Sequence, residues 1–209
     1  MMRPDRRFLL SGALAALLAP ATARAGADFA AVTAPIAMLD NGLTAVMKAG
    51  DATPFAQRFA ILEPVVDKVF DLPRIVAITV GFDWGGFKPE DQQSLLSVFR
   101  RYTIASYVAN FDSYNGQQFR ILPGLRAVGA EQVVSTQLVS RDGTARRIDF
   151  VMLEDGGRWQ VVDVLLDGTI SQVAVQRSDF HSLLASGGAP ALIAGLKKKV
   201  ATLSGNTLT

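Results

Sequence analysis

Apolar residues recur at helical spacing along the first half of the chain. Residues 28–48 form one such pattern, with a kink expected near Pro35. The pair Thr53-Pro54 is typical of an N-cap followed by proline at the first helical position, which predicts a second helix. Two further prolines, Pro73 and Pro89, begin two more helical patterns. The apolar stripes of these three later helices contain Phe59, Leu62, Val66 and Phe70, then residues 74–80, then Leu95, Phe99, Tyr102, Ser106 and Ala109.

From residue 117 onward the pattern changes to the short segments typical of strands. Two turn sequences, Arg141-Asp142-Gly143 and Asp155-Gly156-Gly157, join the last three of these segments. Consecutive strands joined by tight turns predict an antiparallel meander. The predicted strands cover residues 117–122, 132–140, 145–153 and 158–166.

The chain closes with two more helical patterns, one on each side of Gly187-Gly188. The order of helices, then strands, then helices predicts the α+β class. We find no internal repeat and no low-complexity linker, so residues 26–209 are expected to form one domain, with room for a small helical lobe.

The predicted sheet carries apolar residues on both faces. An antiparallel sheet with one face in water alternates apolar and polar residues. The third strand does not follow this rule, because both of its faces are apolar. One face carries Ile148, Phe150 and Met152, and the other carries Val151 and Leu153. In the fourth strand, strict alternation predicts one face with Trp159, Val161 and Leu165. The opposite face is then predicted to carry Val162, Val164 and Leu166. Either helices cover both faces, or one face lines an apolar cavity.

The first 25 residues have the composition of an export signal. Three arginines precede an uncharged run over residues 8–18, and small residues around Ala23-Arg24-Ala25 provide a cleavage site. Arg6-Arg7 also fits a loose twin-arginine pattern, so both Sec and Tat export remain open. The apolar run is shorter than the roughly 20 residues that a span requires. Because charges interrupt the later apolar runs, we expect no membrane-spanning segment after it and a periplasmic location.

Charge and composition exclude several classes of function. The chain has 21 basic and 19 acidic residues, but removing the first 24 residues leaves 17 basic and 18 acidic. The folded part therefore lacks the basic excess of a nucleic-acid-binding protein. Cysteine is absent, which excludes disulfides, zinc–thiolate sites and cysteine nucleophiles.

The sequence offers little catalytic chemistry. His181 is the only histidine, and we find no nucleophile elbow, zinc-binding helix motif or phosphate-binding glycine loop. Asp163 is the one acid flanked by apolar strand residues, and a buried carboxylate needs partners. It is expected to be a hydrogen-bonded or arginine-paired structural residue, and the alternative is a general base in a closed cavity. We predict no catalytic residue, no metal site and no cofactor.

Several segments in order resemble the MlaC-like family of periplasmic lipid-binding proteins, also called toluene-tolerance auxiliary proteins. The resemblance covers roughly residues 35–203. It is carried by Arg58-Phe59, residues 69–75, Gly81-Phe82-Asp83-Trp84, residues 157–164 with Asp167-Gly168 and Ser171, Arg177-Ser178-Asp179-Phe180, and Gly187-Gly188.

Two departures resemble the hopanoid-biosynthesis-associated, HpnM-like branch. The stretch from Gly168 to Arg177 is one residue longer than the family pattern, and Gln176 stands where an aromatic residue is common. The resemblance implies an NTF2-like antiparallel sheet with helices enclosing an apolar cavity, and a phospholipid or hopanoid-type ligand. It also implies two partners, an inner-membrane ABC transporter complex and an outer-membrane lipoprotein complex.

The candidate cavity walls come from the faces of the predicted strands and helices. Apolar walls and a polar mouth are the usual features of a lipid site. Arg177 is a candidate partner of Asp163 or of a lipid headgroup. The candidate ligand-binding residues are Ile75, Val76, Val80, Phe99, Tyr102, Phe119, Phe150, Trp159, Val161, Val164, Val173 and Arg177.

These observations favour a lipid carrier that performs no reaction. One alternative is a small NTF2-like isomerase or hydrolase that uses Asp163. Another is an adaptor that bridges membrane complexes and has no cavity.

Overall fold

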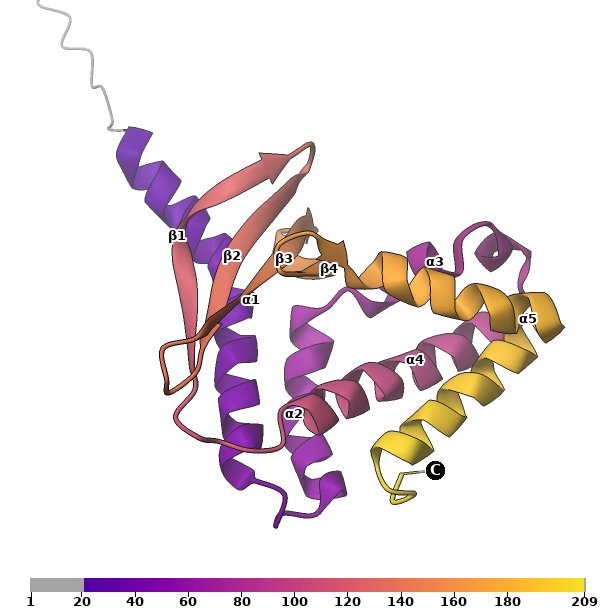
Figure 1. Cartoon of the computed structure of the whole chain (residues 1–209). Coiled ribbons are helices and arrows are strands. Elements are labelled where there is room, and N and C mark those ends of the chain that lie inside the picture. Colours follow the sequence, from indigo (N-terminus) through magenta and orange to yellow (C-terminus); the bar gives the residue numbers. More distant parts are fainter. Residues whose placement is uncertain (1–20, 209) are drawn as a thin grey trace, which may run out of the picture.

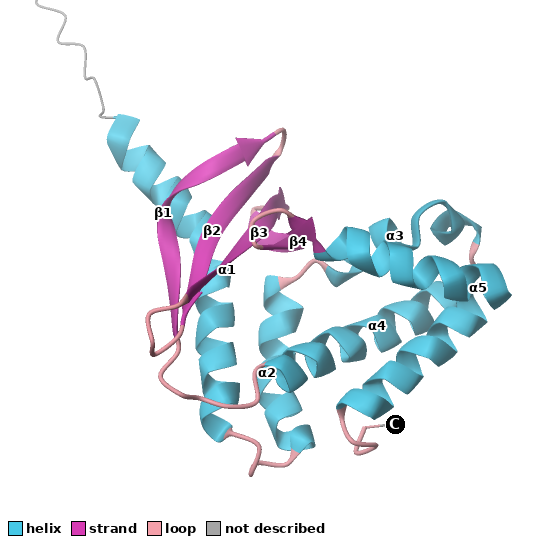
Figure 2. Cartoon of the chain, viewed as in Figure 1, coloured by secondary structure: helices cyan, strands magenta, loops and turns pink. Residues whose placement is uncertain are grey.

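The computed structural model describes the backbone of residues 21–208 and the side chains of residues 29–208, so most of the predicted export signal lies outside the described residues. Within that range helices are followed by a sheet and then by a last long helix (Figures 1 and 2), which confirms the α+β class. The elements are α1 (Ala21–Ala49), α2 (Phe55–Val69), α3 (Leu72–Val80), η1 (Gly81–Gly86), α4 (Pro89–Asn110), β1 (Gln118–Val128), β2 (Glu131–Val139), β3 (Ala145–Asp155), β4 (Arg158–Leu166), β5 (Ile170–Ser171) and α5 (Gln172–Leu203).

Helix α1 contains Pro35, and one apolar stripe of this helix packs into the hydrophobic core. Contrary to the prediction that no later segment is apolar enough to span a membrane, Phe29–Ala49 passes that test by length and composition, since only Asp40 and Lys48 interrupt it. This is weak evidence for a span, because the core helix of a soluble protein passes the same test. The buried stripe consists of Val32, Ile36, Leu39, Leu43 and Val46.

Helix α2 begins without a side-chain cap, so the prediction that Thr53 caps it is wrong. The Thr53 hydroxyl instead donates to the Ala49 carbonyl at the end of α1, at 2.7 Å. The buried guanidinium of Arg58 donates to the carbonyls of Thr53 and Val108, each at 3.2 Å. Arg58 thereby joins the start of α2 to the last turn of α4, where carbonyl groups lack partners within the helix.

Helix α3 begins two residues earlier than predicted because Asp71 caps it. The Asp71 carboxylate accepts from the Arg74 amide at 3.1 Å and pairs with the Arg74 guanidinium at 2.8 Å. Gly81 ends α3 with a φ of +75°, a value that glycine adopts without strain. Helix α4 starts at Pro89, as predicted.

All five strands pair antiparallel with their neighbours in chain order, which confirms the meander. The sequence predicts four of these strands and misses β5, which has only two residues. Strand β1 does not end at residue 122 as predicted. It continues to Val128 through a bulge between Ile121 and Leu125, where Pro123 and Gly124 lie outside the regular ladder. Proline and glycine inside a strand are tolerated at such bulges.

A second bulge changes which residues of β4 face the helices. Val151 pairs with Asp163 and Met152 with Val161, so Val162 is the extra residue. The predicted strict alternation is therefore wrong beyond Val162: Val164 shares the helix-facing side with Val161, whereas Leu165 packs with Val162 on the opposite face. An inserted residue reverses the facing of every side chain after it.

Helix α5 is two helical segments that meet at Gly187 and Gly188, as the sequence predicts. Gly188 has a φ of +62°, which allows the sharp change of direction visible in Figure 1. The second segment returns beside the first, and a side chain at Gly195 would meet the Leu183 side chain at 2.7 Å. Phe180 of the first segment packs edge-on against Phe99 of α4, with ring centroids 6.2 Å apart.

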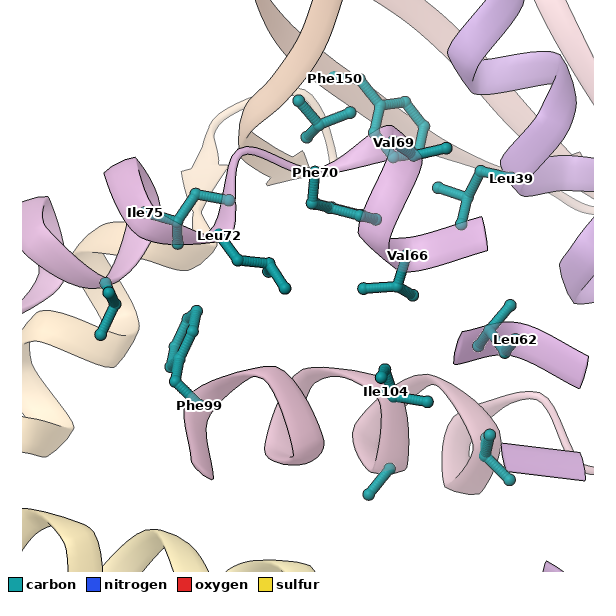
Figure 3. Packing of buried hydrophobic residues seen from close by; sticks show 14 of the residues in the cluster. Leu39, Leu62, Val66, Val69, Phe70, Leu72, Ile75, Phe99, Ile104 and Phe150 are labelled. Atoms are coloured by element: carbon teal, nitrogen blue, oxygen red, sulfur yellow. The ribbon is translucent and has the colours of Figure 1, made fainter. Parts of the chain in front are cut away.

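One large hydrophobic cluster contains residues of all five α-helices and of the inner face of the sheet. Figure 3 shows Phe99 and Ile104 of α4 facing residues of α2 and α3 across this core, with Phe150 of the sheet above them. A smaller cluster of Val133, Val151 and Val162 lies on the outer face. Both faces of the sheet are therefore apolar, as the sequence predicts.

Candidate functional site

A cavity of about 570 Å³ lies between the inner face of the sheet and helices α3, α4 and α5. Its size is within the range of small-molecule sites. Most of its walls are apolar or aromatic. They comprise Leu43, Phe70, Leu72, Ile75, Phe99, Tyr102, Tyr107, Phe111, Phe119, Leu138, Ile148, Phe150, Val164, Leu166 and Val173.

Four aromatic rings form a continuous part of the wall. Phe70 contacts Tyr107 at a centroid distance of 5.6 Å, Tyr107 stacks on Phe111 at 6.2 Å, and Phe111 reaches Phe119 of β1 at 5.9 Å. Aromatic pairs at such distances favour tilted or offset arrangements over a face-to-face sandwich. Burial raises the pKa of the Tyr107 phenol above its ordinary value, so its hydroxyl stays neutral at physiological pH. The sheet and α4 are thus joined by a continuous run of aromatic contacts.

Seven of the twelve predicted ligand-binding residues line this cavity. Their role in binding stays a prediction. They are Ile75, Phe99, Tyr102, Phe119, Phe150, Val164 and Val173.

The other five lie elsewhere. Val76, Val80 and Val161 are buried within the core cluster. Trp159 lines a separate hollow between residues 29–32 of α1 and the bulge of β1. Arg177 is exposed, and its guanidinium lies against Gly81 rather than in the cavity.

Sequence reasoning missed several wall residues, notably Phe70, Tyr107 and Phe111. Tyr107 continues the stripe of Phe99, Tyr102 and Thr103 at helical spacing, so the periodicity of α4 contained a signal for it. Phe70 and Phe111 follow the ends of helices, and their facing depends on how the chain turns there.

Polar side chains interrupt the apolar wall at a few points. The Thr136 hydroxyl is satisfied by the Ile148 carbonyl at 2.8 Å. The Thr103 hydroxyl oxygen, in contrast, is buried and has no hydrogen-bond partner among the described residues. Burying a hydroxyl without a partner is unfavourable, so Thr103 is a position where a bound molecule would gain a hydrogen bond.

Asp163 is fully engaged in holding structure together. Its Oδ1 accepts from the amides of Val164 and Val173 at 2.7 and 3.1 Å, and its Oδ2 accepts from the Ser171 hydroxyl. Ser171 in turn caps α5 by accepting from the Ala174 amide at 3.0 Å. This arrangement matches the predicted hydrogen-bonded structural aspartate. No Arg177 pair with Asp163 is formed in the described part of the chain.

We call the polar, partly exposed side of the lining the mouth; it lies at the start of β3, just after the end of β4 and on the first turns of α5. Arg146, Arg147, Asp167, Gln172 and Gln176 line it. The cavity thus combines an apolar interior with a charged rim, the arrangement that an amphiphile requires. His181 is exposed on α5 and does not line the cavity. Among residues 29–208 no three His, Cys, Asp or Glu side chains are grouped to hold a metal ion.

An antiparallel sheet over helices, with an apolar cavity between them, defines an α+β fold that can enclose an apolar ligand. A family model described as "MlaC protein" matches residues 39–198. The chain belongs to the MlaC family.

A search of solved structures supports the fold. A phospholipid-binding protein from Ralstonia solanacearum, solved in complex with a phospholipid, superposes with a TM-score of 0.68. It is 21% identical, and the match covers 83% of this chain and 98% of that one. No curated protein matched the chain in a sequence comparison.

Proposed function

We propose that this protein is a periplasmic carrier that binds a phospholipid in the cavity between the sheet and helices α3 to α5. The observation that carries the proposal is the aromatic and aliphatic wall of that cavity together with its charged mouth. Membership of the MlaC family and the fold shared with a phospholipid-binding protein support it.

The physical need for such a carrier is clear. A phospholipid has about 30 methylene groups in its two chains, and exposing each to water costs about 0.8 kcal/mol. The total of about 24 kcal/mol makes diffusion of the free lipid through water negligible. An apolar cavity that takes up acyl-chain methylenes offsets part of this cost without any reaction.

The proposed role requires no catalytic group. The isomerase alternative needs Asp163 as a base, but both of its oxygens are already occupied by donors from β4, β5 and α5. The adaptor alternative needs a filled interior, whereas a cavity of about 570 Å³ is present. Both observations favour the carrier.

Export and partners complete the proposal. Cleavage near residue 25 would release residues 26–209 into the periplasm as one lipid-binding domain, by either the Sec or the Tat route. The carrier would exchange lipid between an outer-membrane lipoprotein complex and an inner-membrane ABC transporter complex.

A hopanoid-type lipid is the alternative ligand. Gln176, which distinguishes the chain from the more common family pattern, lines the mouth of the cavity. Its amide would face the polar end of the bound lipid, which is where a hopanoid and a phospholipid differ in chemistry, so Gln176 is placed to discriminate between them.

The decisive experiment is native mass spectrometry of residues 26–209 purified from the periplasm without detergent, followed by solvent extraction and lipid identification. We expect one glycerophospholipid per chain. A polycyclic lipid would assign the protein to the hopanoid branch. An empty protein that takes up no lipid from vesicles would contradict the carrier and favour the adaptor or the enzyme.

A further inference from the structure

A row of inward-facing residues on β3 ends in a cation at the cavity mouth. Phe150, Ile148 and Arg146 alternate along the strand, and all three line the cavity. Leu138, which pairs with Arg146 across β2 and β3, lines it as well. The wall therefore passes from apolar to positively charged within two strand positions, so a bound molecule meets Arg146 where its apolar part ends.

The two neighbouring arginines of β3 differ in what they contact. Arg147 forms a two-pronged pair with the fully buried Asp149, at 2.9 and 2.8 Å, and also reaches Ser135 at 3.2 Å. Arg146 has no carboxylate within ion-pair distance in the part of the chain that the structure describes. Its side chain is exposed, so its donors face water at the mouth.

We propose that Arg146 pairs with the phosphate of the bound lipid and makes the carrier select phospholipids over uncharged lipids with the same acyl chains. This rests on the proposed carrier function. A guanidinium matches phosphate oxygens with two parallel hydrogen bonds, a geometry that neither water nor a lipid hydroxyl reproduces. The acyl chains supply most of the affinity in any lipid, and Arg146 supplies the discrimination.

The acids near the mouth limit which headgroup suits the site. Asp163 is satisfied by its three donors, but Asp167 also lines the mouth and has no ion-pair partner among the described residues. A second negative charge on the lipid would be repelled by Asp167, whereas a positive choline or ethanolamine group would be attracted. A zwitterionic phospholipid is therefore the appropriate probe.

The test is an internal competition. Delipidated protein is incubated with vesicles of dioleoylphosphatidylcholine that contain a minor share of dioleoylglycerol, re-isolated, and its bound lipids are quantified by mass spectrometry. The selectivity is the ratio of the two bound lipids divided by their ratio in the vesicles. Arg146→Gln should lower this selectivity about five- to tenfold. Arg141→Gln is the matched control, because Arg141 is exposed on the same hairpin and does not line the cavity.

The outcomes of this competition distinguish failure of the carrier function from failure of the Arg146 proposal. Uptake of neither lipid by the wild type would contradict the carrier function itself. Uptake of both without selectivity, or equal selectivity in Arg146→Gln and wild type, would overturn the proposal and leave the carrier standing. Inorganic phosphate added at millimolar concentration should not change the selectivity, since the lipid phosphate is tethered at high effective concentration. If it abolishes the selectivity, Arg146 is a site for free anions and the proposal fails.

Discussion

The carboxylate of Asp163 holds the first turn of α5 through the Val173 amide, whose nitrogen lies 3.1 Å from Oδ1. Together with the bond to Ser171, this contact fixes the start of α5 against β4, the strand that carries Val164 in the cavity wall. A carboxylate at a helix N-terminus is also favoured by the helix dipole. Asp163, the one acid that the sequence offered as a catalytic candidate, therefore has a structural role: it connects the sheet to the last helix.

Replacing Asp163 tests this structural role. Asp163→Ala removes the acceptor of three donors and should destabilise the protein by about 1–3 kcal/mol. Asp163→Asn keeps one acceptor oxygen and should lose less. Chemical denaturation measures the stability, and bound lipid is measured after purification at low temperature. Loss of lipid from a fully folded Asp163→Asn protein would argue for a direct functional role instead.

The cavity can be blocked from Val164, a wall residue that is only partly buried. Val164→Trp places a large side chain in the space that the wall residue borders, so we expect a folded protein with at least tenfold less bound lipid. Val175→Trp on the exposed face of α5 is the matched control, since Val175 is 43% exposed and does not line the cavity. Native mass spectrometry gives the lipid content of both. Equal loading of the two variants would place the lipid elsewhere.

Asp40 makes stability depend on pH. Burial raises the pKa of this carboxyl to about 7, and its Oδ1 has no hydrogen-bond partner among the described residues. Because the folded state holds the proton more tightly than the unfolded state, stability falls as pH rises from about 4 to about 7 and then levels off. The loss is at most about 4 kcal/mol.

Asp40→Asn should remove most of this dependence. The variant should gain stability over the wild type at pH 8 and differ little from it at pH 4. Thermal melts across this range, with the exposed Asp112→Asn as the control, measure the difference. Parallel curves for Asp40→Asn and the wild type would show that Asp40 is ionised in the fold at neutral pH at no cost.

The cost of removing a phenylalanine side chain should depend on whether that side chain is buried. Phe180 is fully buried against Phe99, and Phe180→Ala should cost about 3–5 kcal/mol. Phe82 in η1 is 98% exposed, and Phe82→Ala should change stability by less than about 0.5 kcal/mol. Urea denaturation of both variants checks the contrast. A large loss for Phe82→Ala would mean that the residue packs in solution.

The sequence identified the regular elements because their signals are local. Pro89 began α4 as expected, glycine turns placed the hairpins, and Gly187-Gly188 marked the bend in α5. Errors occurred where one local signal competed with another. Thr53 has the residue type of a cap, but its hydroxyl donates to the Ala49 carbonyl of the preceding helix. Pro123 has the residue type of a strand end, but a bulge accommodates it.

The cavity could be predicted only in part. Helical periodicity placed Phe99 and Tyr102 on the correct side of α4. The facing of β4 could not be derived, because the bulge at Val162 depends on pairing with β3 and leaves no mark in the pattern of apolar residues. The position of Phe70 depends on the turn between α2 and α3, which Asp71 and the strand partner Val161 hold.

What the sequence by itself determined is the α+β order, the export signal as an expectation, the scarcity of catalytic groups and the apolar character of both sheet faces. Each depends on composition or on periods of two to four residues, which are readable along one strand or helix. The tertiary structure alone decided that Val164 faces inward, that Asp163 is saturated with donors and that Arg146 stands at the cavity mouth without a carboxylate partner among the described residues. These facts depend on contacts between residues far apart in the chain, which no local pattern records.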